Sequence, residues 1–136
     1  MKHVFDSFAG FDDFLVYMAA ALALLAAFIV IYEKITPYRE FQLIHAGNTA
    51  ASFSLSGAIL GFAIPLGSAV RGSVSLVDMA IWGVIALVVQ LAAFVAVKML
   101  IPSITKDIPA GNSAQGFFLG SVSLAVGVLN AACMSY

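Results

Sequence analysis

Three amide side chains occupy positions where they could do chemistry. Asn48 and Asn112 each follow a glycine and open a long apolar stretch, while Gln90 stands near the middle of another. Two helix N-termini side by side, with their free amides and positive dipole ends, would hold an anionic group. The alternative is that Asn48 and Asn112 only cap their helices. For Gln90, the alternatives are interhelical hydrogen bonding and a place in the lining of a pore.

A second candidate is the segment 36–44, which has the pattern of a short amphipathic helix at the membrane surface. Thr36 would cap this helix and Pro37 would take its first position. Arg39 and Glu40 would point to water. The segment would either anchor the chain at the surface or bind a partner, through residues Tyr38, Arg39, Glu40 and Phe41.

The sequence contains no phosphate-binding loop, zinc-binding HExxH motif or nucleophile elbow. The single cysteine, Cys133, excludes an intrachain disulfide and a cysteine-rich metal site. The carboxylates, from Asp6 to Asp107, stand at the ends of apolar stretches or between them, whereas ion-coupled transporters place ionisable groups at mid-membrane depth. We therefore expect no enzymatic activity, no catalytic residue, no cofactor and no bound metal.

The composition indicates that the solvent of this chain is largely lipid. Of its 136 residues 62% are hydrophobic and 10% are charged, and the mean hydropathy is +1.06. Soluble domains contain roughly 25% charged residues, so this chain could not cover a globular surface with polar groups. A net charge of -1 provides no basic surface for nucleic acid. The expected partner is the lipid bilayer.

Four apolar stretches are long enough to cross a membrane as helices. The first has an acidic lead-in and an apolar run of 19 residues, so we expect a retained helix and not a cleaved signal peptide. The predicted spans are residues 14–32, 48–70, 77–101 and 112–134.

The second and fourth predicted spans are rich in glycine and serine, whereas the first and third are strongly apolar. Small residues belong at helix–helix contacts in lipid, because no hydrophobic force drives helices together there. We therefore expect the second and fourth helices to form the packed interior and the others to face lipid. The predicted packing residues are Gly57, Gly61, Gly116, Gly120, Ser123 and Gly127.

The two halves of the chain resemble each other at an offset of 64 residues. Between residues 44–60 and 108–124, eight of seventeen positions are identical. Such an offset indicates a duplicated unit. We predict an all-α membrane protein with four transmembrane helices, arranged as two tandem helical hairpins in parallel orientation. The repeats would be residues 1–70 and 71–136, within one integral membrane domain.

Basic residues predict which side of the membrane each loop faces, because they are enriched in cytoplasmic loops. The side opposite the hairpin loops contains two, Lys2 and Arg71. The hairpin loops contain four, so these loops are predicted to be cytoplasmic and both termini periplasmic. The four are Lys34, Arg39, Lys98 and Lys106.

Several motifs carry a family resemblance: KITP at 34–37, LI at 43–44, GNTAAS at 47–52, AIWG at 80–83, VQL at 89–91 and NAACM at 130–134. With these motifs the chain resembles the YjfL-like family of bacterial inner-membrane proteins, which contain domain of unknown function 350. The resemblance implies a multi-pass protein with four helices and no assigned biochemical activity. Relatives are often encoded near ATP-grasp ligases or phage-shock-like envelope proteins, which implies a role in envelope stress.

Two functions remain open at this point. The first is a non-enzymatic scaffold or accessory subunit of a membrane complex, which forms homo-oligomers through its glycine and serine faces and binds a partner at the first loop. The alternative is a small oligomeric channel or passive transporter. Its path would be lined by Asn48, Ser52, Ser56, Gln90, Asn112 and Ser123.

Overall fold

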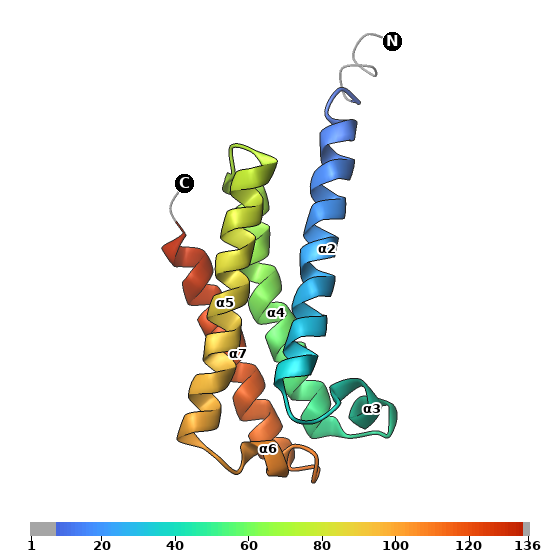
Figure 1. Ribbon diagram of the computed structural model, residues 1–136, viewed down its shortest axis with the longest axis vertical. Helices are drawn as coiled ribbons and strands as arrows, with labels where there is room; N and C mark the ends of the chain where they lie inside the picture. The colour runs from blue at the N-terminus through green and yellow to red at the C-terminus, as the bar shows by residue number, and fades with distance from the viewer. Residues whose placement is uncertain (1–7, 135–136) are drawn as a thin grey trace.

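The described part of the chain, residues 8–134, consists of helices joined by short turns, with no strand in that range (Figure 1). Lys2 and Asp6 lie outside it. Four helices of this computed structural model are long and apolar enough to cross a membrane, which confirms an all-α membrane protein with four transmembrane helices. In chain order the helices are α2 (Phe11–Ile35), α3 (Glu40–His45), α4 (Thr49–Gly72), α5 (Leu76–Leu100), α6 (Ile104–Asp107) and α7 (Ser113–Cys133).

The long helices begin and end within three residues of the predicted spans. The largest difference is at α2, which extends three residues beyond each end of the predicted segment 14–32. It ends at Ile35 because Thr36 precedes Pro37 and is extended, with φ -69° and ψ 137°. Helix α4 continues through Pro65 to Gly72.

Corresponding helices of the two halves begin at the offset seen in the sequence. Helices α3 and α6 start at Glu40 and Ile104, and helices α4 and α7 start at Thr49 and Ser113, 64 residues apart in each case. The similarity between residues 44–60 and 108–124 therefore coincides with similar local structure where each loop enters a long helix.

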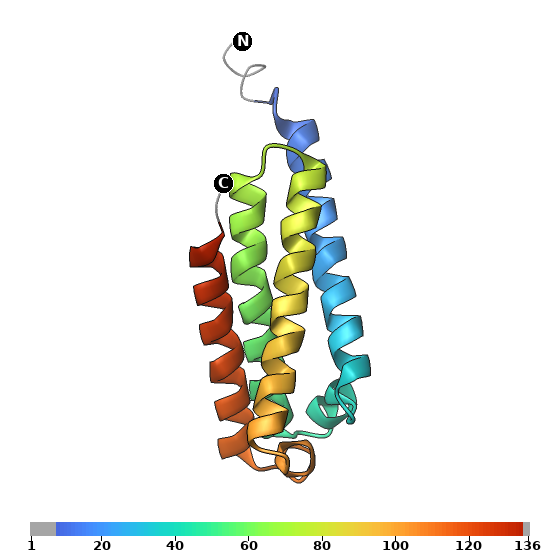
Figure 2. The ribbon, with the colours of Figure 1, turned by 60° about the vertical axis from the view of Figure 1, so that its left-hand side comes forward.

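Helices α4 and α7 form the central pair, and both run away from the end that carries α3 and α6 (Figures 1 and 2). Helix α5 runs antiparallel to them and packs against both. Helix α2 packs against α4 and α5, and its buried side chains, Phe28 and Tyr32, lie in its last two turns. Toward its N-terminal end α2 stands apart from the bundle (Figure 1).

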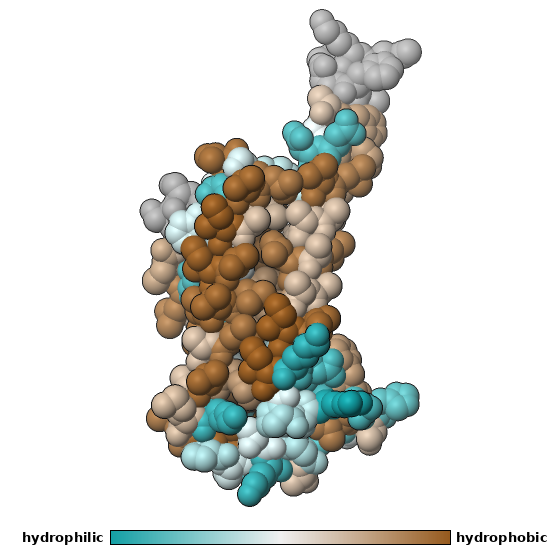
Figure 3. Space-filling view, in the orientation of Figure 1, coloured by the Kyte–Doolittle hydropathy of each residue, from teal (hydrophilic) through white to brown (hydrophobic). Residues whose placement is uncertain are grey.

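The expected division between interior and lipid-facing helices holds for α2 but not for α5. Helix α5 has seven buried residues, whereas α7 has five, three of which are glycines. The reason is that α7 packs through one narrow stripe of small residues, which leaves Phe117 and Leu129 more than 60% exposed. Apolar side chains cover the middle of the molecule, and hydrophilic ones gather mainly at the end with α3 and α6 (Figure 3).

Candidate functional site: a buried carboxyl group where the first loop meets the bundle

The contact between α4 and α7 is a close approach of two backbones. A Cβ atom added at Gly57 would collide with the backbone of Gly120, and one added at Gly127 would collide with Gly61. The contacting pairs are 62–67 residues apart, close to the offset of the repeat. No path runs between the two helices. The predicted packing residues all lie in this contact: Gly57, Gly61, Gly116, Gly120, Ser123 and Gly127.

Gln90 connects α5 to this central pair at about the middle of the bundle. Its Nε2 donates hydrogen bonds to the carbonyl oxygens of Gly61, at 2.8 Å, and Ser123, at 3.0 Å. Pro65 has no amide hydrogen, so the Gly61 carbonyl four residues earlier lacks its regular helical donor. Gln90 supplies the missing donor, as neighbouring helices do for prolines in membrane proteins. With 1% exposure, Gln90 lies in the packed interior.

Asn48 and Asn112 cap α4 and α7. The Oδ1 atom of Asn48 accepts a hydrogen bond from the amide of Ala51 at 3.0 Å, and Oδ1 of Asn112 accepts one from Gln115 at 3.3 Å. The glycine before each asparagine has φ of 88°, a left-handed conformation that glycine adopts without strain. This pairing of glycine and asparagine explains why both residues recur at the offset of the repeat.

Asn48 also joins the two loops. Its Nδ2 donates to the carbonyl oxygens of Ile108, at 3.0 Å, and Pro109, at 3.2 Å. The two loop ends therefore lie side by side, as the anion hypothesis requires, and they line a shallow depression. However, the side-chain amide of Asn48 is already bound to carbonyl oxygens, so the contacts favour capping and loop connection over anion binding.

The first loop differs from the sequence prediction at its start. Helix α3 begins at Glu40 with Arg39 as its N-cap residue, so Thr36 and Pro37 lie outside it. The Thr36 hydroxyl instead donates to the carbonyl oxygens of Glu33, at 3.1 Å, and Tyr38, at 3.2 Å. Because the helix starts later than expected, the predicted orientation of Glu40 toward water is wrong.

Glu40 is completely buried, with 0% exposure, and neither of its carboxyl oxygens has a hydrogen-bond partner in the described chain. Two phenol hydroxyls, which are also buried and have no hydrogen-bond partner in the described chain, lie close enough to Glu40 to interact with it electrostatically. They belong to Tyr32, which is 1% exposed, and Tyr38, which is 8% exposed. We refer to Tyr32, Tyr38 and Glu40 as the carboxyl–tyrosine cluster. It lies where the end of α2 and the start of α3 meet α4.

Aromatic packing holds Tyr32 in this cluster. Its ring stacks on Phe28, with centroids 5.5 Å apart, and meets Phe94 of α5 edge to face at 5.6 Å. Phe28 in turn stacks on Phe62 of α4 at 4.6 Å. Such ring pairs stabilise a fold beyond the area that they bury. The phenol of Tyr32 is therefore fixed by three helices.

The surroundings of Glu40 favour its neutral form. Burial raises the pKa of its carboxyl group to about 7, the Thr36 hydroxyl and the helix backbone oppose this rise, and the negative charge of Glu33 adds to it. The pKa of Tyr38 is also raised, first by burial and then by Glu40, while the hydroxyl of Ser54 opposes the shift. The cluster therefore contains a carboxyl group that changes charge near neutral pH.

The rest of the described chain contains no group of three or more His, Cys, Asp or Glu side chains placed to hold a metal ion. Cys133 is exposed near the end of α7. The carboxyl–tyrosine cluster is thus the most unusual concentration of polar chemistry within residues 8–134, and it lies outside the four membrane-spanning helices except for Tyr32.

Comparison with known proteins identifies the family. The family profile described as Domain of Unknown Function (DUF350) matches residues 6–134. The chain belongs to the DUF350 family. It is 44% identical over 134 residues to the UPF0719 inner membrane protein YjfL of Escherichia coli K12, covering 98% of this chain and 99% of that protein. No solved structure matches it.

A more distant DUF350 relative comes from a different bacterium. The UPF0719 transmembrane protein YshE of Bacillus subtilis 168 is 30% identical over 118 residues, which cover 85% of this chain and 88% of that protein. The four membrane-spanning helices agree with these names, so the chain is a multi-pass inner-membrane protein. The membership confirms the resemblance drawn from the sequence motifs.

The sequence contained one signal for the burial of Glu40 in this DUF350 protein. At the offset of 64 residues Glu40 corresponds to Ile104, the first residue of α6, which has 0% exposure. Had the alignment of the repeats been extended from Ile44 back to Glu40, it would have placed the carboxylate at an apolar, inward-facing position.

Proposed function

We propose that the protein is a non-enzymatic accessory subunit or scaffold of an inner-membrane complex, which binds a partner through its first loop. The observation that carries this proposal is the construction of that loop. Helix α3 packs against the bundle through the buried Tyr38 and Glu40. Arg39 and Phe41 remain exposed, and the exposed fraction of Phe41 is 50%. A fixed backbone that presents an exposed aromatic and a cation is typical of a binding surface.

A pocket of about 500 Å³ opens beside α3 and provides a place for a partner side chain. It contains both signs of charge, which suits a polar or charged segment of protein better than a lipid chain. Its lining residues are Glu33, Lys34, Thr36, Pro37, Tyr38, Arg39 and Gln42.

The orientation belongs to the same proposal. Four basic residues stand in the loops with α3 and α6 or in the last turns of α2 and α5 that lead into them, against two basic residues on the other side, which favours cytoplasmic loops and periplasmic termini. A partner of the first loop would then be a cytoplasmic protein or the cytoplasmic part of another membrane protein.

The interior of the subunit argues against the channel alternative. Gln90 and Ser123, two residues of the suggested path, are each 1% exposed and lie in the packed contact of α4, α5 and α7. Gln90 is further held by two hydrogen bonds to backbone carbonyl oxygens. A path for ions or solutes would therefore have to run between subunits.

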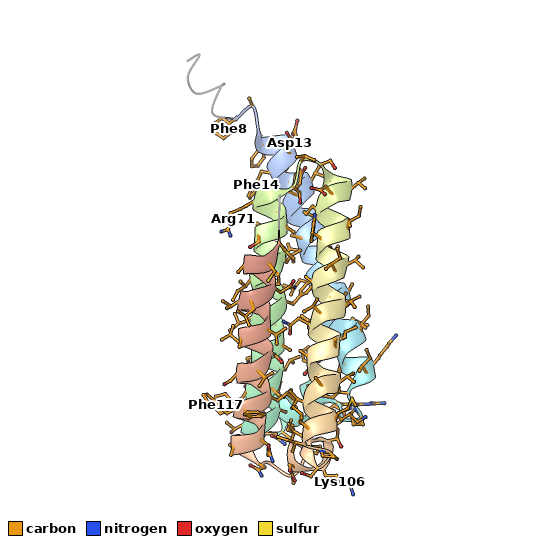
Figure 4. All side chains as sticks on the ribbon, turned by 90° about the vertical axis from the view of Figure 1, so that its left-hand side faces the viewer. Phe8, Asp13, Phe14, Arg71, Lys106 and Phe117 are labelled. Atoms are coloured by element: carbon orange, nitrogen blue, oxygen red, sulfur yellow. The ribbon has the colours of Figure 1, made fainter. Side chains whose placement is uncertain are left out.

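Self-association is expected to use a different face from the one suggested by the sequence. The glycine stripes of α4 and α7 are occupied within the chain, so they are not available to a second copy. Two exposed serines on the outer side of this pair, Ser56 and Ser121, flank a shallow groove and are polar groups available to a second copy in lipid. Phe117, beside them, points away from the bundle (Figure 4).

Site-specific photocrosslinking in native membranes tests the proposal. A photoreactive amino acid at Phe41 should give a discrete protein adduct that is lost in the Arg39→Glu variant. The matched control is Val84, a residue of α5 that is 51% exposed to lipid and should give no such adduct. The absence of any adduct from Phe41, together with solute flux in reconstituted vesicles, would instead favour the channel.

A further inference from the structure

The three members of the carboxyl–tyrosine cluster have polar atoms that the protein itself leaves without partners. Both oxygens of Glu40 and the hydroxyls of Tyr32 and Tyr38 are buried, and none has a hydrogen-bond partner of normal geometry in the described residues, although the hydroxyls of Thr36 and Ser54 lie near Glu40 and Tyr38. Buried polar atoms are satisfied in the great majority of native structures. Four unsatisfied oxygens at one place indicate that something else interacts with them.

The groups that face Glu40 do not include a positive charge. Helix α2 contributes Tyr32 and Glu33, and the loop contributes Thr36 and Tyr38. Helix α4 contributes the hydroxyl of Ser54, beside Tyr38. No lysine, arginine or histidine between residues 8 and 134 forms an ion pair with Glu40. An isolated carboxylate without a counter-charge is too costly to bury.

The fold does not require a polar group at this position. Ile104 occupies the corresponding place at the start of α6, and it is as deeply buried as Glu40. An apolar side chain therefore suffices to dock a short helix against the bundle. Because a glutamate there makes docking costlier when it is charged, its presence in the first loop points to a ligand or a switch and not to packing.

We propose that Glu40, with the hydroxyls of Tyr32 and Tyr38, forms a buried binding site for a single positive charge, which is a proton or a monovalent cation. A proton on Glu40 removes the negative charge and turns the carboxyl group into a donor. A monovalent cation would be bound by the carboxylate and phenol oxygens. A divalent ion suits the site less, because such ions prefer several carboxylate ligands, and the described residues contain no group of three or more His, Cys, Asp or Glu side chains placed to hold a metal.

The bound charge holds α3 on the bundle. Glu40 is the first residue of α3, so a bare carboxylate can reach water only if this end of the helix lifts from α4. Lifting would also move Tyr38 and the adjacent Arg39. This consequence rests on the proposed function, since it makes partner binding at the first loop dependent on pH or on the cation.

The test uses the full chain in lipid nanodiscs, with infrared spectroscopy to follow the carboxyl C=O band and hydrogen exchange to follow α3. In choline chloride, the difference in the carboxyl C=O band between wild type and Glu40→Gln should change with pH, with a midpoint near 7. For hydrogen exchange, the rate in α3 of the wild type is divided by the rate in α3 of the Glu40→Gln variant. This ratio should rise about tenfold per pH unit between the ordinary carboxyl pKa and this midpoint, and then level off.

Sodium and potassium chloride distinguish the two ligands. If either salt lowers the midpoint and slows exchange of α3 at high pH, the ligand is that cation; Tyr32→Phe and Tyr38→Phe should then weaken the effect of the salt. If neither salt acts, the ligand is the proton. Glu33→Gln, which changes a partly exposed carboxylate on α2, should still titrate, and Glu40→Ile should keep α3 docked at every pH.

A midpoint at the ordinary value of a carboxyl group in all three salts would overturn the site, as would exchange in α3 that does not differ between wild type and Glu40→Gln. Either result leaves the adducts formed from Phe41 unaffected. Conversely, missing adducts would overturn the proposed function while the titration of Glu40 could still be observed.

Discussion

The link between Gln90 and Pro65 leads to a quantitative prediction. Replacing Gln90 by leucine removes its hydrogen bonds to Gly61 and Ser123 while keeping a side chain of similar size. The Ser123 carbonyl keeps its regular donor within α7. The Gly61 carbonyl is left without a donor, because Pro65 cannot provide one.

The two losses differ in size. An interhelical hydrogen bond in a membrane protein contributes about 0.6 kcal/mol on average, which applies to the Ser123 bond. An unsatisfied buried carbonyl costs about 1–3 kcal/mol, which applies to Gly61. Gln90→Leu is therefore expected to lower the free energy of unfolding by about 2–4 kcal/mol.

A double-mutant cycle with Pro65→Ala isolates this effect. Alanine at 65 restores an amide hydrogen for the Gly61 carbonyl, so Gln90→Leu in that background should cost only about 0.6 kcal/mol. Unfolding in mixed micelles with increasing denaturing detergent measures all four proteins. Additive effects of the two substitutions would refute the idea that Gln90 compensates for the proline.

Three further predictions concern packing, capping and pH. Gly120→Leu should unfold the bundle or separate α4 from α7, as judged by detergent unfolding, whereas Gly67→Ala should be tolerated because no atom lies within 4 Å of the added Cβ. Asn48→Ala should cost more stability than Asn112→Ala, about 2 against about 1 kcal/mol, since Asn48 also joins the two loops; equal melting shifts would contradict this. The folded state raises the pKa of Glu40 from 4.5 to about 7, so stability should be highest below the lower value and fall as pH rises to the upper one. Glu40→Gln should abolish this slope in thermal unfolding.

The sequence predicted the features that depend on local chemistry and on the bilayer. Length and hydropathy located four helices, because a membrane leaves few alternatives to a helix. The glycine–asparagine pairs located the caps, since a left-handed glycine followed by a capping side chain requires only neighbouring residues. The small residues of α4 and α7 lie at a helix–helix contact in the structure.

Features that depend on the relative rotation of elements were not predictable in this way. The periodicity of segment 36–44 placed Glu40 toward water, because Thr36 and Pro37 resembled a helix start. In the structure the Thr36 hydroxyl instead donates to the carbonyl oxygens of Glu33 and Tyr38, and the helix starts three residues later than predicted, at Glu40. Because residues 36–39 are not helical, the face predicted from a helix beginning at Pro37 does not apply to Glu40.

The sequence also did not predict how the buried residues are divided among the helices. Strong hydropathy suggested that α5 faces lipid, yet Gly83 and Ala86 let it approach the bundle while Phe94 fills the space beside Tyr32. Hydropathy reports transfer into an apolar medium and does not distinguish lipid from protein interior.

The positions at which the two halves differ carry more information about function than those at which they agree. The shared glycine–asparagine pairs are explained by capping, and the small residues of α4 and α7 by their close packing. Pro65 in the first half has Leu129 at the corresponding position, and Gln90 of the second half supplies the donor that this proline removes. Each half thus contains one part of a complementary pair, the proline in the first half and the side-chain donor in the second. Glu40 against Ile104 is the other such difference, and it has no compensating partner anywhere in the described chain. If Glu40 served only to pack α3 against the bundle, its unsatisfied buried carboxyl group would only destabilise the fold, and Glu40→Ile would be expected to improve stability without loss of any partner adduct at neutral pH.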